Sequence, residues 1–181
     1  MLRRALPVFL ICLAACGEPA EDPIARDFAV VKAALANICQ SPEFPRMVVA
    51  DEPVDYSDHG IPNDWSHAAD YSQDFKRRAK ETSRWPIGEI CTNARVVSQQ
   101  AIDAELARDQ RIPPGWEAFH TTFGAMGLNA YSRPAYSRDG KHAALYVDTH
   151  CGVGCGMGLL LELELTDKGW KVVRAVGTWL S

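Results

Sequence analysis

The densest group of chemically reactive side chains lies in one glycine-rich stretch, residues 150–158. It contains His150, Cys151, Cys155 and Met157. Imidazole, thiolate and thioether groups are ligands for Cu(I) or zinc, so a soft-metal site is one interpretation. Neighbouring residues of a strand point to opposite faces, however, which makes it difficult for His150 and Cys151 to share one metal. We favour the alternative in which Cys151 and Cys155 form a disulfide across the loop, and redox exchange fits less well because three residues separate the two cysteines.

Another cysteine ends an apolar run near the N-terminus. Arg3 and Arg4 precede residues 5–15, and the run closes with Leu13-Ala14-Ala15-Cys16. A basic start, a short apolar stretch and small residues before a cleavage point are typical of a secretory signal. The stretch is too short to span a bilayer, which needs about 20 apolar residues.

This start resembles the lipobox of bacterial lipoproteins. The resemblance implies that residues 1–15 are removed and that Cys16 becomes the N-terminus, with a diacylglyceryl group on sulfur and palmitate or a related acyl group on the amine. In such lipoproteins an aspartate after the cysteine favours the inner membrane, and Gly17 stands there instead. We therefore expect a lipid anchor in the bacterial cell envelope, in the outer membrane and facing the periplasm. The alternative is an ordinary secretory signal with a cysteine there by chance.

Four cysteines remain for the folded part of the chain: Cys39, Cys91, Cys151 and Cys155. The periplasm is oxidising, so an even number of cysteines there predicts disulfides. Three connectivities are possible. We favour Cys39–Cys91 and Cys151–Cys155, because the second pair is close enough in sequence for a local bridge and the first pair then has only each other.

The charge balance of the mature chain limits the classes of partner that it is expected to bind. Removing residues 1–15 takes two of the 19 basic residues and none of the 23 acidic ones, which leaves a formal charge of −6. Nucleic-acid binding requires a basic face, so we expect no nucleic-acid partner. The same balance leaves the acyl chains as the expected membrane contact.

The elements that position these groups begin after a polar tether, residues 16–23, which has two prolines and little to bury. Apolar side chains recur at helical spacing over residues 24–39, and a second helical run covers residues 97–109. The acidic stretch 51–74 predicts a turn-rich loop, and the basic residues of 76–84 directly after it could neutralise it locally. A calcium site in this loop is an alternative, although the spacing of an EF-hand is absent.

The pattern changes after residue 116. Turn signals and alternating apolar residues predict four strands near residues 127–137, 142–150, 157–166 and 170–180. We therefore predict one α+β domain over residues 24–181, an antiparallel four-stranded meander with the N-terminal helices packed on one face. Its expected shape resembles a cystatin-like or nuclear-transport-factor-like half cone.

A further resemblance covers residues 114–181. It rests on Ser137-Arg138-Asp139-Gly140, the Cys-Gly-x-x-Cys-Gly-x-Gly loop from Cys151 to Gly158, the adjacent pair Gly169-Trp170 and the closing Trp179-Leu180-Ser181. In this order they resemble an uncharacterised bacterial envelope domain, many members of which are secreted or lipid-anchored. The resemblance implies a fold family and no known reaction.

The remaining candidates are single residues. His120 lies among apolar neighbours, which favours a packed histidine. Trp65 belongs to the polar loop, so we expect it near the surface as a possible contact residue. The histidines lack metal-helix spacing and no serine lies in a Gly-x-Ser-x-Gly turn, so no catalytic residue, resident metal or cofactor is predicted.

The functional hypothesis combines the expected location of the protein with the chemistry of its candidate residues. We expect a non-enzymatic lipoprotein that faces the periplasm and binds a protein or a small ligand. A metal-handling protein or an enzyme that uses the Cys151–Cys155 loop is one alternative. A structural partner in an envelope assembly is another.

Overall fold

The computed structural model describes residues 22–108 and 116–181. Residues 1–15, Cys16 and most of the tether therefore lie outside the described residues. The helices are α1 (Pro23–Ala34), α2 (Ala36–Gln40), α3 (Ala68–Arg78), α4 (Gln99–Arg108) and α5 (Trp116–Phe123). The strands are β1 (Met47–Ala50), β2 (Gly88–Cys91), β3 (Ala94–Val97), β4 (Gly127–Tyr131), β5 (Ala135–Tyr136), β6 (His142–Gly152), β7 (Cys155–Thr166) and β8 (Gly169–Leu180).

Helix α1 begins where the sequence provides a cap. The Asp22 carboxylate accepts a hydrogen bond from the backbone N–H of Ile24 at 3.0 Å. Pro23 occupies the first helical position, where a backbone N–H is not needed. The start of the helix is therefore fixed close to the end of the tether.

All strands belong to one mixed sheet in the order β2-β3-β1-β4-β6-β7-β8, with β5 paired to β6. Strand β1 runs parallel to both of its neighbours, β3 and β4. The other named pairs are antiparallel, and β6, β7 and β8 form two long hairpins. Gly140 has a φ of 68° in the turn before β6, a backbone conformation that favours glycine.

The prediction of a four-stranded antiparallel meander was wrong, because the sheet continues past β4 into β1, β3 and β2. These three strands have four residues each, too few to show an alternating pattern. All four residues of β1 are buried, as is typical of a strand covered on both faces, so they form a continuous apolar run. A short run of this kind does not distinguish a strand from other buried segments.

Helices cover both faces of the sheet, which also corrects the expectation of one covered face. Val30 and Val31 of α1 share a core with Leu145 and Leu161, whereas α3 packs against the alternate residues of β6 and β7. Helices α4 and α5 cover β1 and β4 on the α3 side, because their core includes Leu128 rather than its neighbour Asn129. The long strands are therefore sandwiched between α1 and α3.

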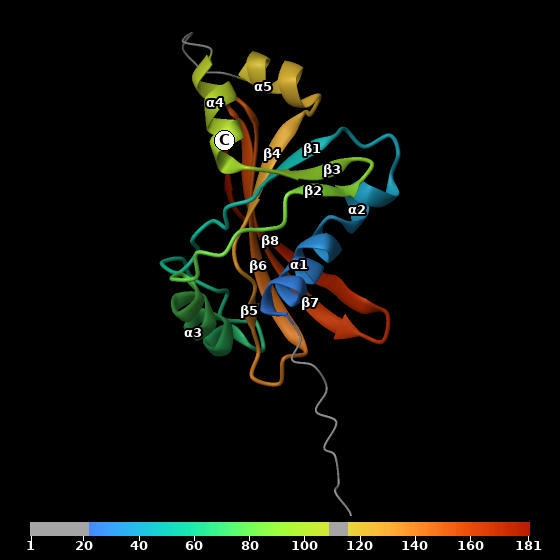
Figure 1. Ribbon diagram of the computed structural model, residues 1–181. Helices are drawn as coiled ribbons and strands as arrows, with labels where there is room; N and C mark the ends of the chain where they lie inside the picture. The colour runs from blue at the N-terminus through green and yellow to red at the C-terminus, as the bar shows by residue number, and fades with distance from the viewer. Residues whose placement is uncertain (1–21, 109–115) are drawn as a thin grey trace, which may run out of the picture.

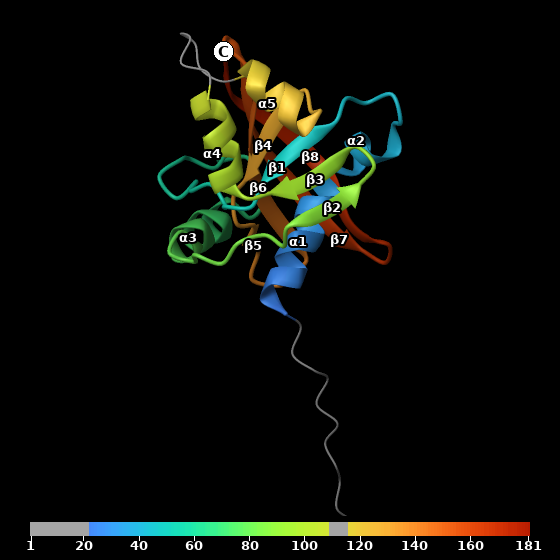
Figure 2. The same ribbon diagram turned by 45° about the horizontal axis from the view of Figure 1, so that its top comes forward.

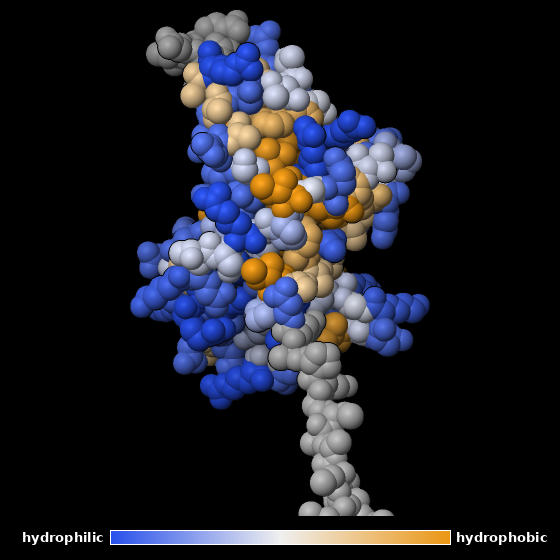
Figure 3. Space-filling view, viewed as in Figure 1, coloured by the Kyte–Doolittle hydropathy of each residue, from blue (hydrophilic) through white to orange (hydrophobic). Residues whose placement is uncertain are grey.

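The pictures show how these layers are placed. In Figure 1, α1 crosses the long C-terminal strands, α4 and α5 lie at one end of the sheet, and α3 lies toward the other end near β5. Figure 2 shows the same arrangement with α4 and α5 turned forward beside β1 and β4. In Figure 3, apolar residues gather down the middle of the visible face, over β1, β3 and α1, between hydrophilic flanks.

Candidate functional site

A groove with a volume of about 650 Å³ lies between the α1–α2 segment and the sheet. This volume lies within the range of small-molecule sites in proteins. The floor comes from four neighbouring strands, β4, β6, β7 and β8. The groove is lined by Ala33, Ala34, Ala36, Asn37, Ile38, Gln40, Asn129, Tyr131, Val147, Thr149, Leu159, Leu161, Trp170, Lys171, Val172 and Ala175.

Strand register explains how the floor is assembled. Tyr131 lies opposite Val147, and Val147 lies opposite Leu159, so these side chains form one row across three strands. Leu161 pairs with Ala175 in the row beside it, toward the part of the sheet that α1 covers. Because successive residues of a strand alternate between faces, the alternating leucines of β7 supply a continuous apolar floor.

A small polar cluster lies at the β4 end of this floor. Asn129 is 3% exposed, and its Oδ1 accepts a hydrogen bond from the Thr149 hydroxyl at 2.9 Å. Its Nδ2 donates to the Tyr131 hydroxyl at 3.3 Å. Burial raises the pKa of Tyr131 far above its usual range, so this hydroxyl stays neutral. The buried amide is therefore held in a fixed orientation by neutral partners.

The α2 wall of the groove is held in place by a disulfide and by hydrogen bonds from Asn93. The disulfide Cys39–Cys91, with 5.7 Å between the Cα atoms, ties α2 to β2. Asn93 Nδ2 donates to the backbone carbonyls of Ile38 at 3.2 Å and Ser41 at 2.8 Å, which satisfies the end of the helix. These bonds hold a helix that is too short to be stable alone.

The lining of the groove carries few ionisable side chains. Among the described residues that line the groove, none is an aspartate, a glutamate or a histidine. Lys171 and the neutral Tyr131 are its ionisable side chains. An apolar floor with one oriented amide is a composition found in many ligand sites.

The structure confirms the expected disulfide pairing and does not gather the alternative metal ligands. Cys151 and Cys155 are bridged, with 5.2 Å between their Cα atoms. The His150 ring faces Trp179, with 5.5 Å between centroids, and its Nε2 lies 3.2 Å from Asp148 Oδ1. Met157 is paired with Thr149 on the groove face, whereas His150 pairs with Gly156 on the other. Within the described chain, no group of three or more histidine, cysteine or acidic residues is placed to hold a metal.

The glycines of this loop have a packing reason. A Cβ at Gly156 would lie 2.8 Å from the Trp179 ring, and one at Gly158 would overlap the same indole. Trp179 therefore lies on a backbone surface that two glycines leave open, and its Nε1 donates to the Tyr146 hydroxyl at 2.8 Å. The glycine-rich motif and the closing Trp-x-Ser thus belong to one packing unit.

Asp148 and His150 form a carboxylate–imidazole pair on β6. Its adjacent cysteine, Cys151, is held in a disulfide and does not supply a nucleophilic thiol. His120 is a packed residue of α5, with Nδ1 2.7 Å from the carbonyl oxygen of Ala125. Neither histidine lies in the groove.

Trp65 corrects the expectation of a surface contact. It is 3% exposed, and its ring lies edge-on to Tyr71, with 6.2 Å between centroids. The loop around it is polar, but its indole turns inward and packs against α3. The polar residues around Trp65 in the sequence therefore gave no indication that its side chain is buried.

Several carboxylates of the acidic stretch pair with protein groups. Asp51 accepts the backbone N–H of Gln99 at 2.7 Å and pairs with Arg84. Asp74 pairs with Arg77, which is one of the local neutralisations predicted from the sequence. Others use distant arginines, namely Asp70 with Arg138 and Asp64 with Arg174.

Sequence reasoning missed the groove itself. Its polar residues, Asn129 and Thr149, come from β4 and β6, and the sequence shows no motif that joins them. An amide in an otherwise apolar strand was the available signal, since Asn129 lies between Leu128 and Ala130. The helix that roofs the groove was predicted, but the hollow between it and the sheet was not.

No protein-family model, no curated protein and no solved structure matches this chain. The similarity of residues 114–181 to an envelope domain and the lipobox therefore stay predictions. In residues 22–108 and 116–181, no helix is long and apolar enough to cross a membrane.

Proposed function

We propose that this protein is a non-enzymatic binding protein that holds a small, partly apolar molecule in the groove between α1–α2 and the sheet. The observation that carries the proposal is the buried, fixed amide of Asn129 at one end of an apolar floor. A few oriented polar groups in a mostly apolar hollow are typical of ligand sites. The fastened α2 wall supports a site that exists before the ligand arrives.

The proposed location rests on the N-terminal sequence. Cys16 would carry the lipid that anchors the protein in the cell envelope, in the outer membrane and facing the periplasm. The two disulfides of the folded part are consistent with an oxidising compartment. The binding site would then face the periplasm at the length of a short tether from the membrane.

The test uses N-phenyl-1-naphthylamine, a neutral dye whose fluorescence rises in apolar surroundings. Ala175 is exposed, lines the groove and lies opposite Leu161, so Ala175→Phe fills the groove from the edge strand. Val173 is 49% exposed on the same strand and is not a lining residue, so Val173→Phe is the matched control. We expect dye binding by the unaltered protein and by the control, and at least a tenfold loss in Ala175→Phe. Equal binding by both variants would contradict the proposal.

A further inference from the structure

We infer that the ligand of this groove is a single aliphatic chain that carries a neutral, hydrogen-bonding head group. This inference rests on the proposed function and specifies the class of molecule bound. The juxtaposition that supports it is an aliphatic floor across four strands with a half-satisfied amide at the β4 end.

The shape of the floor fits a chain. Four neighbouring strands at the usual spacing span about 14 Å, and the groove crosses all of them. The floor between its ends consists of Val147, Leu159, Leu161 and Ala175, with aromatic rings at the ends. The helical wall presents the small side chains of Ala33, Ala34 and Ala36, which leave a shallow channel beside the floor. A flexible aliphatic molecule can follow such a surface.

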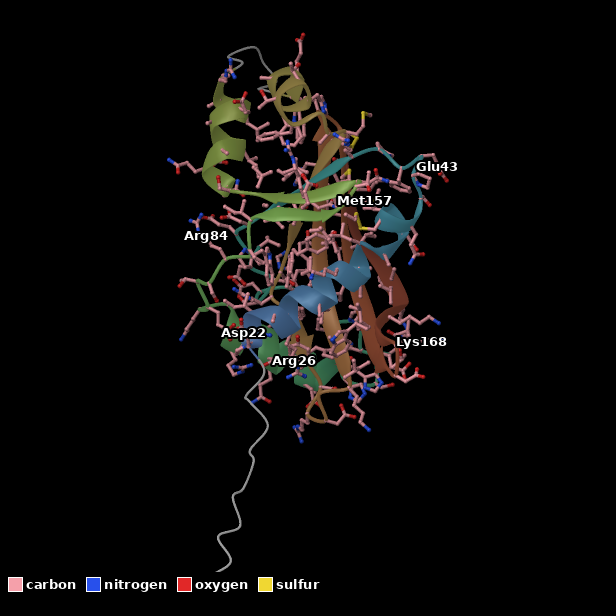
Figure 4. All side chains as sticks on the ribbon, turned by 45° about the vertical axis from the view of Figure 1, so that its right-hand side comes forward. Asp22, Arg26, Glu43, Arg84, Met157 and Lys168 are labelled. Atoms are coloured by element: carbon pink, nitrogen blue, oxygen red, sulfur yellow. A yellow bond between two sulfur atoms is a disulfide. The ribbon has the colours of Figure 1, made fainter. Side chains whose placement is uncertain are left out.

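The alternating residues of β7 show where the channel opens. Leu163 is fully buried and Leu161 is 7% exposed, whereas Met157 is 41% exposed on the same face. Figure 4 places Met157 and Lys168 at opposite ends of the β7–β8 hairpin, with Met157 on the side of α2. The apolar strip therefore emerges from beneath α1 toward α2, so apolar surface is available to a chain laid beside it.

The head group follows from the hydrogen bonds of Asn129. A side-chain amide has two donor hydrogens and an oxygen that can accept two bonds. Tyr131 takes one donor and Thr149 occupies one acceptor position. Counting partners in residues 22–108 and 116–181, one donor and one acceptor remain, which is the complement of an amide or a hydroxyl group.

Charged heads fit this end of the groove poorly. An ammonium group would find no carboxylate among the described lining residues, and a carboxylate would meet a neutral amide and a neutral hydroxyl. Either charge would lose hydration without gaining a charged partner there. Lys171 lines the groove from β8, at the far side of the floor from β4. The polar end at β4 therefore selects a neutral head.

The experiment is displacement of N-phenyl-1-naphthylamine from the purified full-length chain by hexanamide, octanamide, decanamide and dodecanamide. Cys16→Ser is present in every sample, so that no acyl group of the protein itself competes. We expect affinity to rise about fourfold for each added methylene until the chain fills the groove. Alkylammonium ions and alkanoates of the same length should bind at least tenfold more weakly. No dependence on chain length, or tighter binding of either charged series, would overturn the inference.

Two variants test the head-group contact. Asn129→Leu should weaken alkanamide binding about tenfold and leave the dependence on chain length unchanged. Asn129→Asp should reverse the preference and favour alkylammonium ions over alkanamides. Retained dye binding shows in each case that the groove is intact, and an unchanged head-group preference in both variants would overturn the inference. If the unaltered protein binds no dye, the proposed function fails; if dye binds without chain or head selectivity, only the present inference fails.

Discussion

At the scale of single residues, a buried ion network joins segments that are distant in sequence. Asp27 on α1 is 2% exposed and accepts hydrogen bonds from Arg78 on α3 at 3.0 Å and from Arg133 at 3.1 Å. The Tyr136 hydroxyl donates to the same carboxylate at 2.9 Å. Burying these charges costs solvation energy, which their mutual bonds offset only while every partner is present.

We predict that Asp27→Asn lowers the free energy of unfolding by about 3–5 kcal/mol. The amide keeps the shape of the side chain, but it leaves two buried guanidinium groups facing a neutral group. Asp58→Asn, at an exposed carboxylate, is the control and should change stability by less than about 0.5 kcal/mol. Urea unfolding measures both, and similar losses in the two variants would contradict the assignment of the network.

The sequence could reveal only part of this network. Asp27 lies beside Phe28 in a run that was predicted to be helical, so an acid close to its apolar side was visible. Its partners lie 51 and 106 residues away, and no local pattern links them. The same reason hid Asn129 and Thr149, whose meeting depends on the pairing of β4 with β6.

At the scale of elements, β7 and β8 are fitted to each other through Trp179. Its indole covers Gly156 and Gly158, and its N–H is bound by Tyr146 on β6. Side chains at these glycines would displace the ring from both strands. These two glycines are therefore required for packing, whereas Gly152 and Gly154 have the positive φ values near the turn.

We predict that Gly158→Ala destabilises the protein by about 1–3 kcal/mol, because the added methyl displaces the Trp179 ring. Gly177→Ala on β8 is the matched control, since a Cβ there meets nothing within 4 Å. Denaturant unfolding gives the stability, and the Trp179 indole N–H resonance, assigned with Tyr146→Phe, reports the ring position. A resonance unmoved in Gly158→Ala would show that the ring tolerates the methyl group.

Long elements were predictable where short ones were not. Alternation of Leu161, Leu163 and Leu165 with Glu162 and Glu164 identified the strand now seen as β7. Strand β1 has four consecutive buried residues and pairs in parallel with strands on either side, so neither its period nor a nearby turn indicated its place. The architecture was missed for this reason, although the turn before β8 lies where the sequence indicated it.

At the scale of the whole molecule, the two disulfides differ in what they hold. Cys39–Cys91 closes a loop of 52 positions and fastens the groove wall to the edge of the sheet. Cys151–Cys155 closes four positions within one hairpin. The entropy that a disulfide removes from the unfolded chain grows with the length of its loop.

We therefore predict that Cys39→Ala with Cys91→Ala costs about 4 kcal/mol, whereas Cys151→Ala with Cys155→Ala costs about 2 kcal/mol. The first pair of changes should also weaken dye binding, because α2 loses its covalent link to β2. The second should leave dye binding unchanged. Thermal unfolding and dye titration measure both effects, and weaker dye binding in the second variant alone would contradict the roles given to the two bridges.

The position of β1 also imposes an order in time. Its partners begin at Ala94 and Gly127, so β1 is synthesised well before β4, the strand that completes its pairing. Parallel pairing between distant segments is slow, because the entropy of closing a long loop is lost before the stabilising contacts form. The β6–β7–β8 hairpins form between segments that are adjacent in sequence, so they can form sooner. The apolar segment of β1 therefore stays exposed to solvent until β4 pairs with it. A partly folded chain would most readily associate with another through this segment.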